Sequence, residues 1–423
     1  MYEQIFEEIV NIIHHDYAGC EDKRGWDDPE KYREKIYNQN LTAHEFVELV
    51  EEYIADLKDP HMFFRLIGEE KALDIGFKVR RYENALYVTE LIGETRLEIG
   101  DRIVALDQLR INEISEIYSK YLYDKPSERE NWLPVLKKYN EATIKKSNGD
   151  IKQIRIRRYV KSDYKPEYSF EKLKPDTSYI KMTDFLNPDS INQLIQKHEH
   201  ELNTSDYLIL DVRKNLGGSD SAFQALIPFL FPEGKTKLDL AKNYTQIFNA
   251  TDRSSDLTIR SVQEFMSNVE DPQVKKNAQS FIDTWKKYRG KGFVVFDQDL
   301  NPEPELIEGK SNPKKVAVLS DVYCGSAGDV FVEFCKFSNK VTVIGRGTAG
   351  VNDYSNLARM RWDNQFELLY PTSKLTRVDE GKGMTGIGIL PDVYIPWTPE
   401  HLTRDVDLEH ALDLFYQESL TFD

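Results

Sequence analysis

Cysteine is scarce in this sequence, and its scarcity bears on where the protein works. The 423 residues contain three cysteines, Cys20, Cys324 and Cys335. Three cysteines cannot all pair with one another, and their spacing does not match a metal site. A reducing cytoplasm is therefore the simpler interpretation, with an extracytoplasmic location as the alternative if a leader peptide has been removed.

Long apolar runs, positive charge and nucleotide or metal motifs are lacking too. No apolar run reaches the length of a bilayer span, and the acidic amphipathic start of the chain does not resemble a signal peptide. A net charge of −16 argues against nucleic acid and anionic membranes as partners, because both need clustered Lys and Arg. The sequence has no H-E-x-x-H, no P-loop and no dinucleotide fingerprint, so we expect no metal and no cofactor.

What is present is the composition of a globular protein of two or three domains. The chain is 40% hydrophobic and 30% charged, and it is too long for one ordinary core. Residues 1 to about 60 have helical periodicity, and residues 72–160 form short strands with a hairpin at Asn148-Gly149. From about 177 onward strands and helices alternate, which is typical of an α/β core. Residues 233–312 are polar and weakly periodic, which suggests an insertion or lid.

Ser326 lies where a strand gives way to a helix. The segment 316–331, VAVLSDVYCGSAGDVF, is apolar at first, turns near Gly325 and then shows helical spacing. The free N–H groups and the dipole of a helix N-terminus favour an alkoxide or oxyanion beside Ser326. The alternative is that Ser326 only caps the helix. We interpret Cys324 as a packing residue, because the sequence gives it no obvious activating partner.

His61 is the second candidate for chemistry. It follows Asp59-Pro60 where a helix ends, and an apolar strand follows it. Neutral imidazole suits a general base near pH 7, but a hydrogen-bonded structural role is common for such a histidine.

Four segments in order along the chain resemble peptidase family S41, the C-terminal processing proteases. They are LILDVRKNLGGSDS at 208–221, SDVYCGSAGDVF at 320–331, VTVIGRGTAG at 341–350 and GIGILPDVYI at 386–395. The strands of residues 75–107 are similar to the PDZ-like domain of these enzymes, with Gly76 and Phe77 where a peptide-binding loop would lie. The resemblance therefore extends over nearly the whole chain.

The resemblance implies a fold class and a domain order. The expected fold is α/β, with a crotonase-like (ClpP/crotonase) core, a PDZ-like β-rich domain and an N-terminal helical segment. We place the helical segment at 1–70, the PDZ-like domain at 71–165 and the catalytic core at 166–423, with the lid or insertion at about 233–312.

The resemblance also assigns roles to residues. Ser326 matches the nucleophile, and the backbone N–H groups of Gly217 or Gly218 and of Ala327 match the oxyanion hole. Glycines allow the backbone to approach the scissile carbonyl, and preorganised donors stabilise the developing oxyanion. Asn215 is expected to brace the glycine turn.

The sequence differs from the best-known branch of the family in the residue that would serve as the catalytic general base. That branch uses a lysine in a turn like T-x-G-K, and here Val351 stands in that place. Valine cannot accept a proton, so the resemblance shifts to the branch that includes tricorn-core and nisin-resistance proteases, in which His61 would be the base. Thr385 falls where that branch has a glutamate. The orienting residue stays open among Glu380, Asp379, Asn352 and Asp353.

Two functions of different classes follow. The first is a serine endopeptidase that acts on peptide or protein substrates. The alternative is a catalytically weak peptide-binding protein that keeps the fold, motivated by the missing lysine. Acyl-CoA chemistry is a weaker third reading, which the PDZ-like insertion disfavours. The oligomeric state stays open, a homo-oligomer included.

Overall fold

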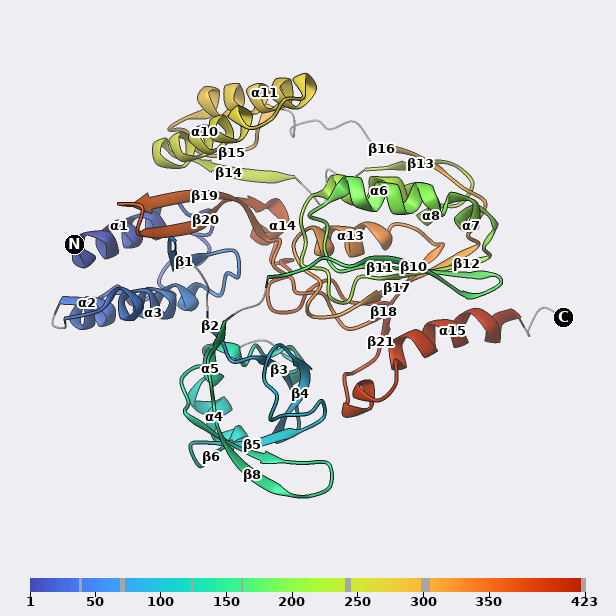
Figure 1. Ribbon diagram of the computed structural model, residues 1–423. Helices are drawn as coiled ribbons and strands as arrows, with labels where there is room; N and C mark the ends of the chain where they lie inside the picture. The colour runs from blue at the N-terminus through green and yellow to red at the C-terminus, as the bar shows by residue number, and fades with distance from the viewer. Residues whose placement is uncertain are drawn as a thin grey trace. The chain divides into compact units, whose positions relative to one another are not determined.

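The chain folds into two compact units, each assembled from separate stretches of sequence. The computed structural model describes residues 1–37, 40–68, 73–122, 125–160, 163–239, 245–297 and 305–419. The first unit combines residues 1–69, 237–305 and 351–385. The second combines residues 70–236, 306–350 and 386–423. Figure 1 shows by colour how blue, yellow and orange-red segments meet in the first unit.

Helices at the N-terminus of the chain open the first unit. They are α1 (Tyr2–His15), α2 (Pro29–Tyr37) and α3 (Ala43–Ile54), followed by the 3₁₀ turn η1 (Ala55–Leu57). In α1 the isoleucines recur at helical spacing and are buried. Helix α3 begins at a capping box, in which Glu45 accepts from the Thr42 N–H at 2.8 Å and donates its own N–H to Thr42 Oγ1 at 3.3 Å.

An antiparallel sheet completes the core of the first unit. Strand β20 (Phe366–Leu375) is buried along its whole length and pairs with β19 (Tyr354–Trp362) on one side. On the other side it pairs first with β1 (Phe63–Leu66) and then with β14 (Gln246–Ala250), which continues to β15 (Gly292–Val294). Between β1 and β14, the Ala18 N–H donates to the Pro371 carbonyl at 2.9 Å. The loop after α1 is thereby tied to the central strand.

The region expected to be an insertion contains two long helices of the first unit. Helix α10 (Asp252–Ser267) is capped by Thr251, and α11 (Pro272–Tyr288) is capped by Asp271. They lie side by side next to β14 and β15 (Figure 1). Trp285 of α11 is fully buried against the rings of Phe248 and Phe296. The weak periodicity of this region reflects helices that bury few residues.

The core sheet of the second unit is mostly parallel, and it confirms the expected α/β fold class. Its strands are, in order, β10 (Tyr168–Lys174), β11 (Thr177–Met182), β12 (Tyr207–Asp211), β17 (Lys315–Ser320), β18 (Val341–Gly345) and β21 (Val393–Tyr394). All neighbours from β11 to β21 run parallel, and β10 is antiparallel. Near-continuous apolar strands such as 207–211 are buried on both faces, as a covered parallel sheet requires.

Helices cover this core sheet. Helix α15 (Val406–Ser419) packs Ala411 and Phe415 on residues of β12, β17 and β18. Figure 1 shows α13 (Ala327–Cys335) and α6 (Pro188–Lys197) on the side of the sheet away from α15. The carboxyl ends of β12 and β17 lie side by side, because these strands are parallel neighbours. The loops that leave them therefore meet at one edge, the usual place of a site in such folds.

A second, antiparallel sheet of this unit contains β3 (Phe77–Tyr82), β4 (Ala85–Leu91), β5 (Arg102–Leu106), β7 (Glu141–Lys145) and β8 (Ile151–Arg155). Strand β6 (Leu109–Arg110) pairs with β5, and α4 (Ile111–Ile117) and α5 (Leu133–Leu136) belong to the same region. The hairpin expected at Asn148-Gly149 is confirmed, with Gly149 at φ +93° between β7 and β8. The PDZ-like assignment and the domain boundaries stay predictions.

The remaining elements are short. They are β2 (Leu73–Asp74), β9 (Tyr159–Val160), β13 (Gly234–Leu238), β16 (Glu305–Gly309), α7 (Glu199–Thr204), α8 (Ile227–Leu230), α14 (Thr376–Asp379), η2 (Ser127–Arg129), η3 (Asp220–Leu226) and η4 (Pro399–Leu402).

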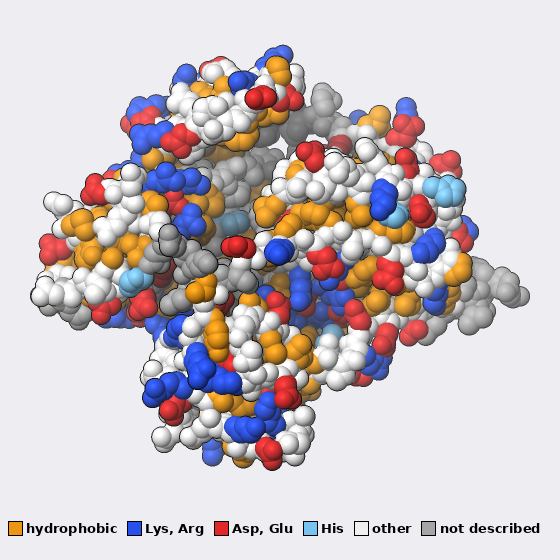
Figure 2. All heavy atoms as spheres, in the orientation of Figure 1, with side chains coloured by type: hydrophobic (Ala, Val, Ile, Leu, Met, Phe, Trp, Pro, Cys, Tyr) orange, Lys and Arg blue, Asp and Glu red, His pale blue; other side chains and the backbone are white. Residues whose placement is uncertain are grey.

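The visible surface mixes charged and apolar side chains. Figure 2 shows acidic and basic side chains interspersed over the face in view, with apolar side chains between them. Among the helices of the described ranges, we find none with the length and apolar character of a membrane span.

Candidate active site

Ser326 occupies a strained turn between β17 and α13. Its backbone has φ +57° and ψ −120°, which is rare for a residue with a side chain. Such a conformation costs on the order of 1–3 kcal/mol and persists only when its surroundings fix it. Ser326 is also the residue immediately before the first helical turn of α13, whose N–H groups lack intrahelical partners. Ser326 therefore combines a strained backbone with a position at the N-terminus of a helix.

Asp329 fixes this turn from within the helix. One oxygen of its carboxylate accepts the Ser326 N–H at 2.9 Å, and the other accepts the Gly350 N–H at 2.8 Å. Asp329 is fully buried. A carboxylate at a helix N-terminus is favoured by the helix dipole, and two N–H donors compensate for its burial. The acidic residue three positions after the serine thus joins the serine turn to the turn that follows β18.

The glycine turn after β12 lies against the serine. Gly217 has φ +81°, and a methyl group on its Cα would lie 2.6 Å from Ser326 Cβ and 2.7 Å from the Gly325 carbonyl oxygen. Gly218 has φ +144°, and a methyl group there would lie 2.3 Å from the Phe185 carbonyl. No other residue type fits either position without movement of the backbone. Both glycines are therefore needed for the contact between the two turns.

Asn215 links the same two turns. It is fully buried, and its carbonyl accepts the Gly325 N–H at 3.0 Å. Its side-chain oxygen accepts the Gly217 N–H at 2.9 Å, and its side-chain nitrogen donates to the Met182 carbonyl at 3.2 Å. The Gly217 amide is therefore already occupied. Within the described ranges, the Gly218 amide has no acceptor, and the Ala327 amide begins the helix.

Cys324 lies two residues from the serine but has the environment of a packing residue. It is fully buried, and burial together with the Asp329 and Asp321 carboxylates raises the pKa of its thiol well above the ordinary value. A thiol in that state is a poor nucleophile. Its Sγ would lie 2.8 Å from a methyl group on Gly328, so the two residues are in close contact.

A buried network of ion pairs holds the start of the serine turn. Asp321, the first residue after β17, accepts two hydrogen bonds from Arg80 of β3, at 2.9 and 3.0 Å. Arg346 donates to Asp321 at 3.0 Å and to Asp407 at 2.6 Å. Arg213, which follows β12, reaches Asp407 as well, at 3.2 Å. The antiparallel sheet is thereby joined to the core sheet at the turn that leads to Ser326.

His61 belongs to the first unit, where two contacts hold it. Its backbone N–H donates to Asp59 Oδ1 at 3.0 Å, and its Nδ1 lies 2.7 Å from the Tyr354 carbonyl oxygen. A carbonyl can only accept, so Nδ1 carries the hydrogen of this bond. In the neutral ring Nε2 is then the atom that can accept a proton. This partner could not be predicted, because a backbone carbonyl has no signature in the sequence.

The four carboxylate or amide candidates for orienting the histidine have different surroundings, and one of them, Asp379, pairs with Lys374 at 2.6 Å. Asp353 is buried and accepts from the Met384 N–H at 2.9 Å, the Thr385 N–H at 2.8 Å and Thr385 Oγ1 at 2.7 Å. Glu380 is exposed and forms an ion pair with Lys382 at 2.7 Å. Asn352 is partly exposed. The sequence analysis did not single out Asp59, which lies only two positions before His61 and accepts its backbone N–H.

The predicted peptide-binding pair lies at the start of the antiparallel sheet. Gly76 has φ +79°, and its carbonyl accepts the Ile92 N–H at 2.7 Å and the Glu94 N–H at 3.1 Å. A methyl group on Gly76 would lie 2.6 Å from the ring of Tyr159. Phe77 is buried in the core of this sheet.

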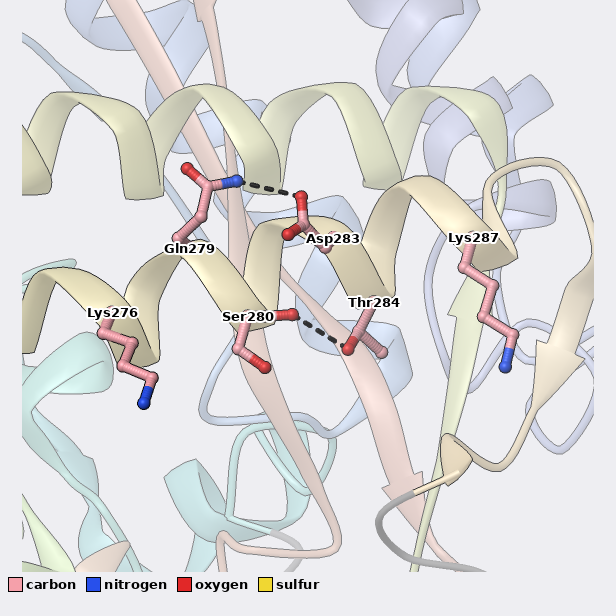
Figure 3. A pocket seen from close by; sticks show the side chains of 6 residues that line it. All are labelled: Lys276, Gln279, Ser280, Asp283, Thr284 and Lys287. Carbon is pink, nitrogen blue, oxygen red and sulfur yellow. Dashed lines mark hydrogen bonds between the residues drawn. The ribbon is translucent and has the colours of Figure 1, made fainter.

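A surface hollow along α11 is lined by polar side chains that do not form a catalytic group. Figure 3 shows the polar side chains of one helix that line it: Lys276, Gln279, Ser280, Asp283, Thr284 and Lys287. Gln279 donates to Asp283 at 2.9 Å, and Thr284 donates to the Ser280 carbonyl at 3.0 Å. These are bonds between successive turns of a helix, and they do not gather reactive groups. In the described ranges, no three side chains of His, Cys, Asp or Glu cluster as a metal site would need.

Comparison with known proteins gives the class and then the family. The protein is a serine-type peptidase, and the chain belongs to peptidase family S41, whose sequence model matches residues 176–395. That range includes Ser326 and the glycine turn, and His61 lies outside it. No curated protein matches the chain.

Solved structures of mature CPAF share the fold. Mature CPAF in complex with lactacystin has a TM-score of 0.66 and 13% identity, with 98% of this chain and 97% of that chain covered. Mature CPAF alone has a TM-score of 0.64 and 13% identity, with coverage of 98% and 96%. The tricorn protease has a TM-score of 0.46 and 15% identity, with coverage of 99% of this chain and 36% of its own. At these identities the CPAF structures show the fold alone, which has the crotonase-like core expected from the sequence.

Proposed function

We propose that this protein is an endopeptidase in which Ser326 is the nucleophile and His61 the general base. The observation that carries the proposal is the strained Ser326 backbone at the N-terminus of α13, braced by Asp329 and pressed against Gly217. Strain of this kind is retained where function requires it. A capping serine needs no such conformation, since an N-cap residue ordinarily has extended backbone.

In the proposed reaction, Ser326 Oγ attacks the scissile carbonyl carbon while its proton passes to His61 Nε2. The carbonyl oxygen becomes an oxyanion, which the amides of Gly218 and Ala327 stabilise. When the tetrahedral intermediate collapses, the C–N bond breaks and the proton passes to the leaving amine. Water then hydrolyses the acyl-enzyme by the same steps. Each oxyanion donor is worth about 2.7–4 kcal/mol in such enzymes.

Gly218 is a better oxyanion donor than Gly217 in this proposal. The Gly217 amide is bound to the Asn215 side chain, whereas the Gly218 amide has no acceptor among the described residues. A donor that is already bound would have to break that bond before it could stabilise the oxyanion.

We further propose that the antiparallel sheet with Gly76 and Phe77 is a PDZ-like domain that receives a peptide as an added strand. Support comes from the Arg80–Asp321 pair, which joins this sheet to the segment leading to Ser326. We also propose a reducing compartment, since all three cysteines are free thiols.

The test is cleavage of an unfolded protein such as casein by the purified chain, followed by mass spectrometry of the products. We expect internal cuts by the wild type and a loss of at least 10³-fold in kcat for Ser326→Ala and His61→Ala. A folded wild type that binds peptides, without turnover, would favour the alternative of a peptide-binding protein. That alternative is motivated by Val351, which replaces the family lysine.

A further inference from the structure

The loop that carries His61 is held by a carboxylate that binds the backbone N–H of the histidine. Asp59 Oδ1 accepts the His61 backbone N–H at 3.0 Å, while the ring itself contacts the Tyr354 carbonyl. The side chain of Asp59 is 1% exposed. A carboxylate so deeply buried needs specific compensation for its charge. Two neighbouring residues, Tyr17 and Lys23, stabilise the buried charge of Asp59.

Tyr17 supplies one part of that compensation. Its hydroxyl donates to Asp59 Oδ2 at 2.6 Å, and the tyrosine is fully buried. Burial and the Asp59 charge raise the pKa of Tyr17 well above its ordinary value, so the hydroxyl keeps its proton and stays a donor. The two oxygens of Asp59 thus have separate tasks: one holds the histidine loop and the other holds the loop that follows α1.

Lys23 supplies the opposite charge. Its ammonium lies 3.9 Å from Asp59 Oδ2 and is 5% exposed. Within the described ranges its Nζ has no hydrogen-bond partner, and it lies 4.2 Å from the centre of the Tyr354 ring. The rings of Tyr17 and Trp26 are within 6 Å as well. A cation over aromatic faces without a direct hydrogen bond acts mainly through its charge.

Other charged groups lie around Lys23 and Asp59, including Lys58, whose Nζ is 5.9 Å from the centre of the Trp26 ring. Burial lowers the pKa of Lys23, and the carboxylates of Asp59, Asp353 and Asp22 oppose that shift. Asp22 is itself paired with Lys374 at 2.9 Å, and Lys374 also binds Asp379 at 2.6 Å. Tyr354 donates its hydroxyl to Asp22 at 3.2 Å. The residue whose carbonyl orients the His61 ring is therefore tied to the same cluster.

We propose that Asp59, held by Tyr17 and charge-balanced by Lys23, is the positioning residue for His61. The inference rests on the proposed role of His61 as the general base. In this arrangement the Tyr354 carbonyl fixes the orientation of the His61 ring, and Asp59 fixes the position of the His61 backbone. The Nε2 atom of the ring then remains available to accept the proton. The carboxylate acts on the histidine through the main chain, where a triad would place it on Nδ1.

The first experiment compares Asp59→Asn with Asp27→Asn. Asp27 is a matched control, because it is buried in the same unit and accepts the hydroxyl of Tyr53 at 2.5 Å, as Asp59 accepts that of Tyr17. We expect both variants to lower the melting temperature by similar amounts. Only Asp59→Asn should lower kcat, by about 10–100-fold, with KM within twofold, since positioning acts on the chemical step.

The second experiment replaces the neighbours and follows activity against pH. Tyr17→Phe should lower kcat in the same sense as Asp59→Asn, and Tyr53→Phe should not; this pair keeps the test intact if Asp59→Asn does not fold. Lys23→Met removes the positive charge 3.9 Å from Asp59 Oδ2 and leaves that carboxylate unbalanced. The unbalanced negative charge of Asp59, which binds the backbone N–H of His61, favours the imidazolium, so the acid limb of kcat/KM should move to higher pH by about 0.5–1 unit.

The outcomes separate this inference from the proposed function. If His61→Ala retains activity, the proposed base is wrong and the inference falls with it. If His61→Ala abolishes activity while Asp59→Asn and Asp27→Asn have equal kcat, the base stands and only the positioning role is refuted. An unchanged pH profile in Lys23→Met would refute the proposed role of Lys23 in balancing the charge of Asp59.

Discussion

The Cα of Gly217 lies so close to Ser326 that any β-carbon on it would lie 2.6 Å from the serine Cβ. Real β-carbons do not approach other atoms so closely, so the contact requires glycine. It fixes the distance between the loop after β12 and the serine turn. The two loops come from parallel neighbours, whose carboxyl ends the sheet places side by side.

Replacement of Gly217 by alanine should cost both stability and activity. The left-handed backbone costs about 1–2 kcal/mol and the forced contact about 1–3 more. Movement of the serine should lower kcat/KM by about 100-fold. Gly100→Ala is the control, because Gly100 has φ +92° with open space around it. It should show the backbone cost in urea denaturation and leave kcat/KM unchanged; equal kinetic losses would contradict the account.

Asp329→Asn should disturb the serine turn with little change in volume. The amide group can no longer accept from both the Ser326 and Gly350 N–H groups, so one buried donor is left unsatisfied at about 1–3 kcal/mol. We expect kcat to fall by about 100-fold. Asp271→Asn is the comparison, since Asp271 also accepts two N–H groups at the start of a helix, at 2.7 and 3.1 Å. Its kcat should match the wild type.

The pair of Arg80 and Asp321 should show strong energetic coupling. Both side chains are at most 10% exposed, and the geometry is bidentate. A double-mutant cycle of Arg80→Met and Asp321→Asn should give a coupling of about 2–3 kcal/mol in urea denaturation. The exposed pair of Lys181 and Glu167 should give less than about 1 kcal/mol. Similar values for the two pairs would refute the structural role of Arg80.

The same aspartate predicts how stability depends on pH. Although burial alone would raise the pKa of Asp321, Arg80 and Arg346 hold it well below the ordinary 3.8. The folded state therefore binds fewer protons than the unfolded state, and the stabilisation is present above about pH 4 and lost as the pH falls further. The advantage of the wild type over Asp321→Asn in unfolding free energy should shrink from pH 6 to pH 3. An advantage that grows on acidification would contradict this pKa.

Thiol reagents should leave the enzyme active. Cys324 and Cys335 are buried, and the pKa of Cys20 is raised to about 11 by burial and by Glu21. Iodoacetamide at pH 7 should therefore change neither peptide cleavage nor labelling by a serine-directed probe, whereas a fluorophosphonate should abolish cleavage. Inactivation by iodoacetamide that Cys324→Ala removes would point to a cysteine enzyme.

The parts of the fold that the sequence predicted are those with local signals. The apolar strand before Ser326, the hairpin at Asn148-Gly149 and the parallel core follow from periodicity and turn chemistry. The central strand β20 was missed. Pro371 lies within it, and proline argues against an interior strand. The structure accommodates it opposite Leu357, where its carbonyl accepts the Ala18 N–H.

The candidate site also has parts that could be predicted from the sequence and parts that could not. While the catalytic roles of Ser326, Gly217 and Gly218 stay predictions, the positions of their turns were predictable from apolar periodicity and from the resemblance to family S41. The contact of His61 with the Tyr354 carbonyl was not, because any residue supplies a carbonyl. Tyr17, Lys23 and Asp59 come from the loop after α1 and the end of η1, and only the folded chain unites them. Contacts between residues so far apart in the chain produce no regular spacing that could be recognised in the sequence.

Fluorophosphonate labelling followed by peptide mapping shows whether Ser326 is the nucleophile and whether His61 activates it. We expect one adduct on the wild type, carried by the peptide that contains Ser326. The adduct should be absent in Ser326→Ala and strongly slowed in His61→Ala. His198→Gln, which alters a histidine stacked on Phe170, should label like the wild type. An adduct that persists in Ser326→Ala, or labelling of His61→Ala at the wild-type rate, would contradict the assignment of nucleophile or base.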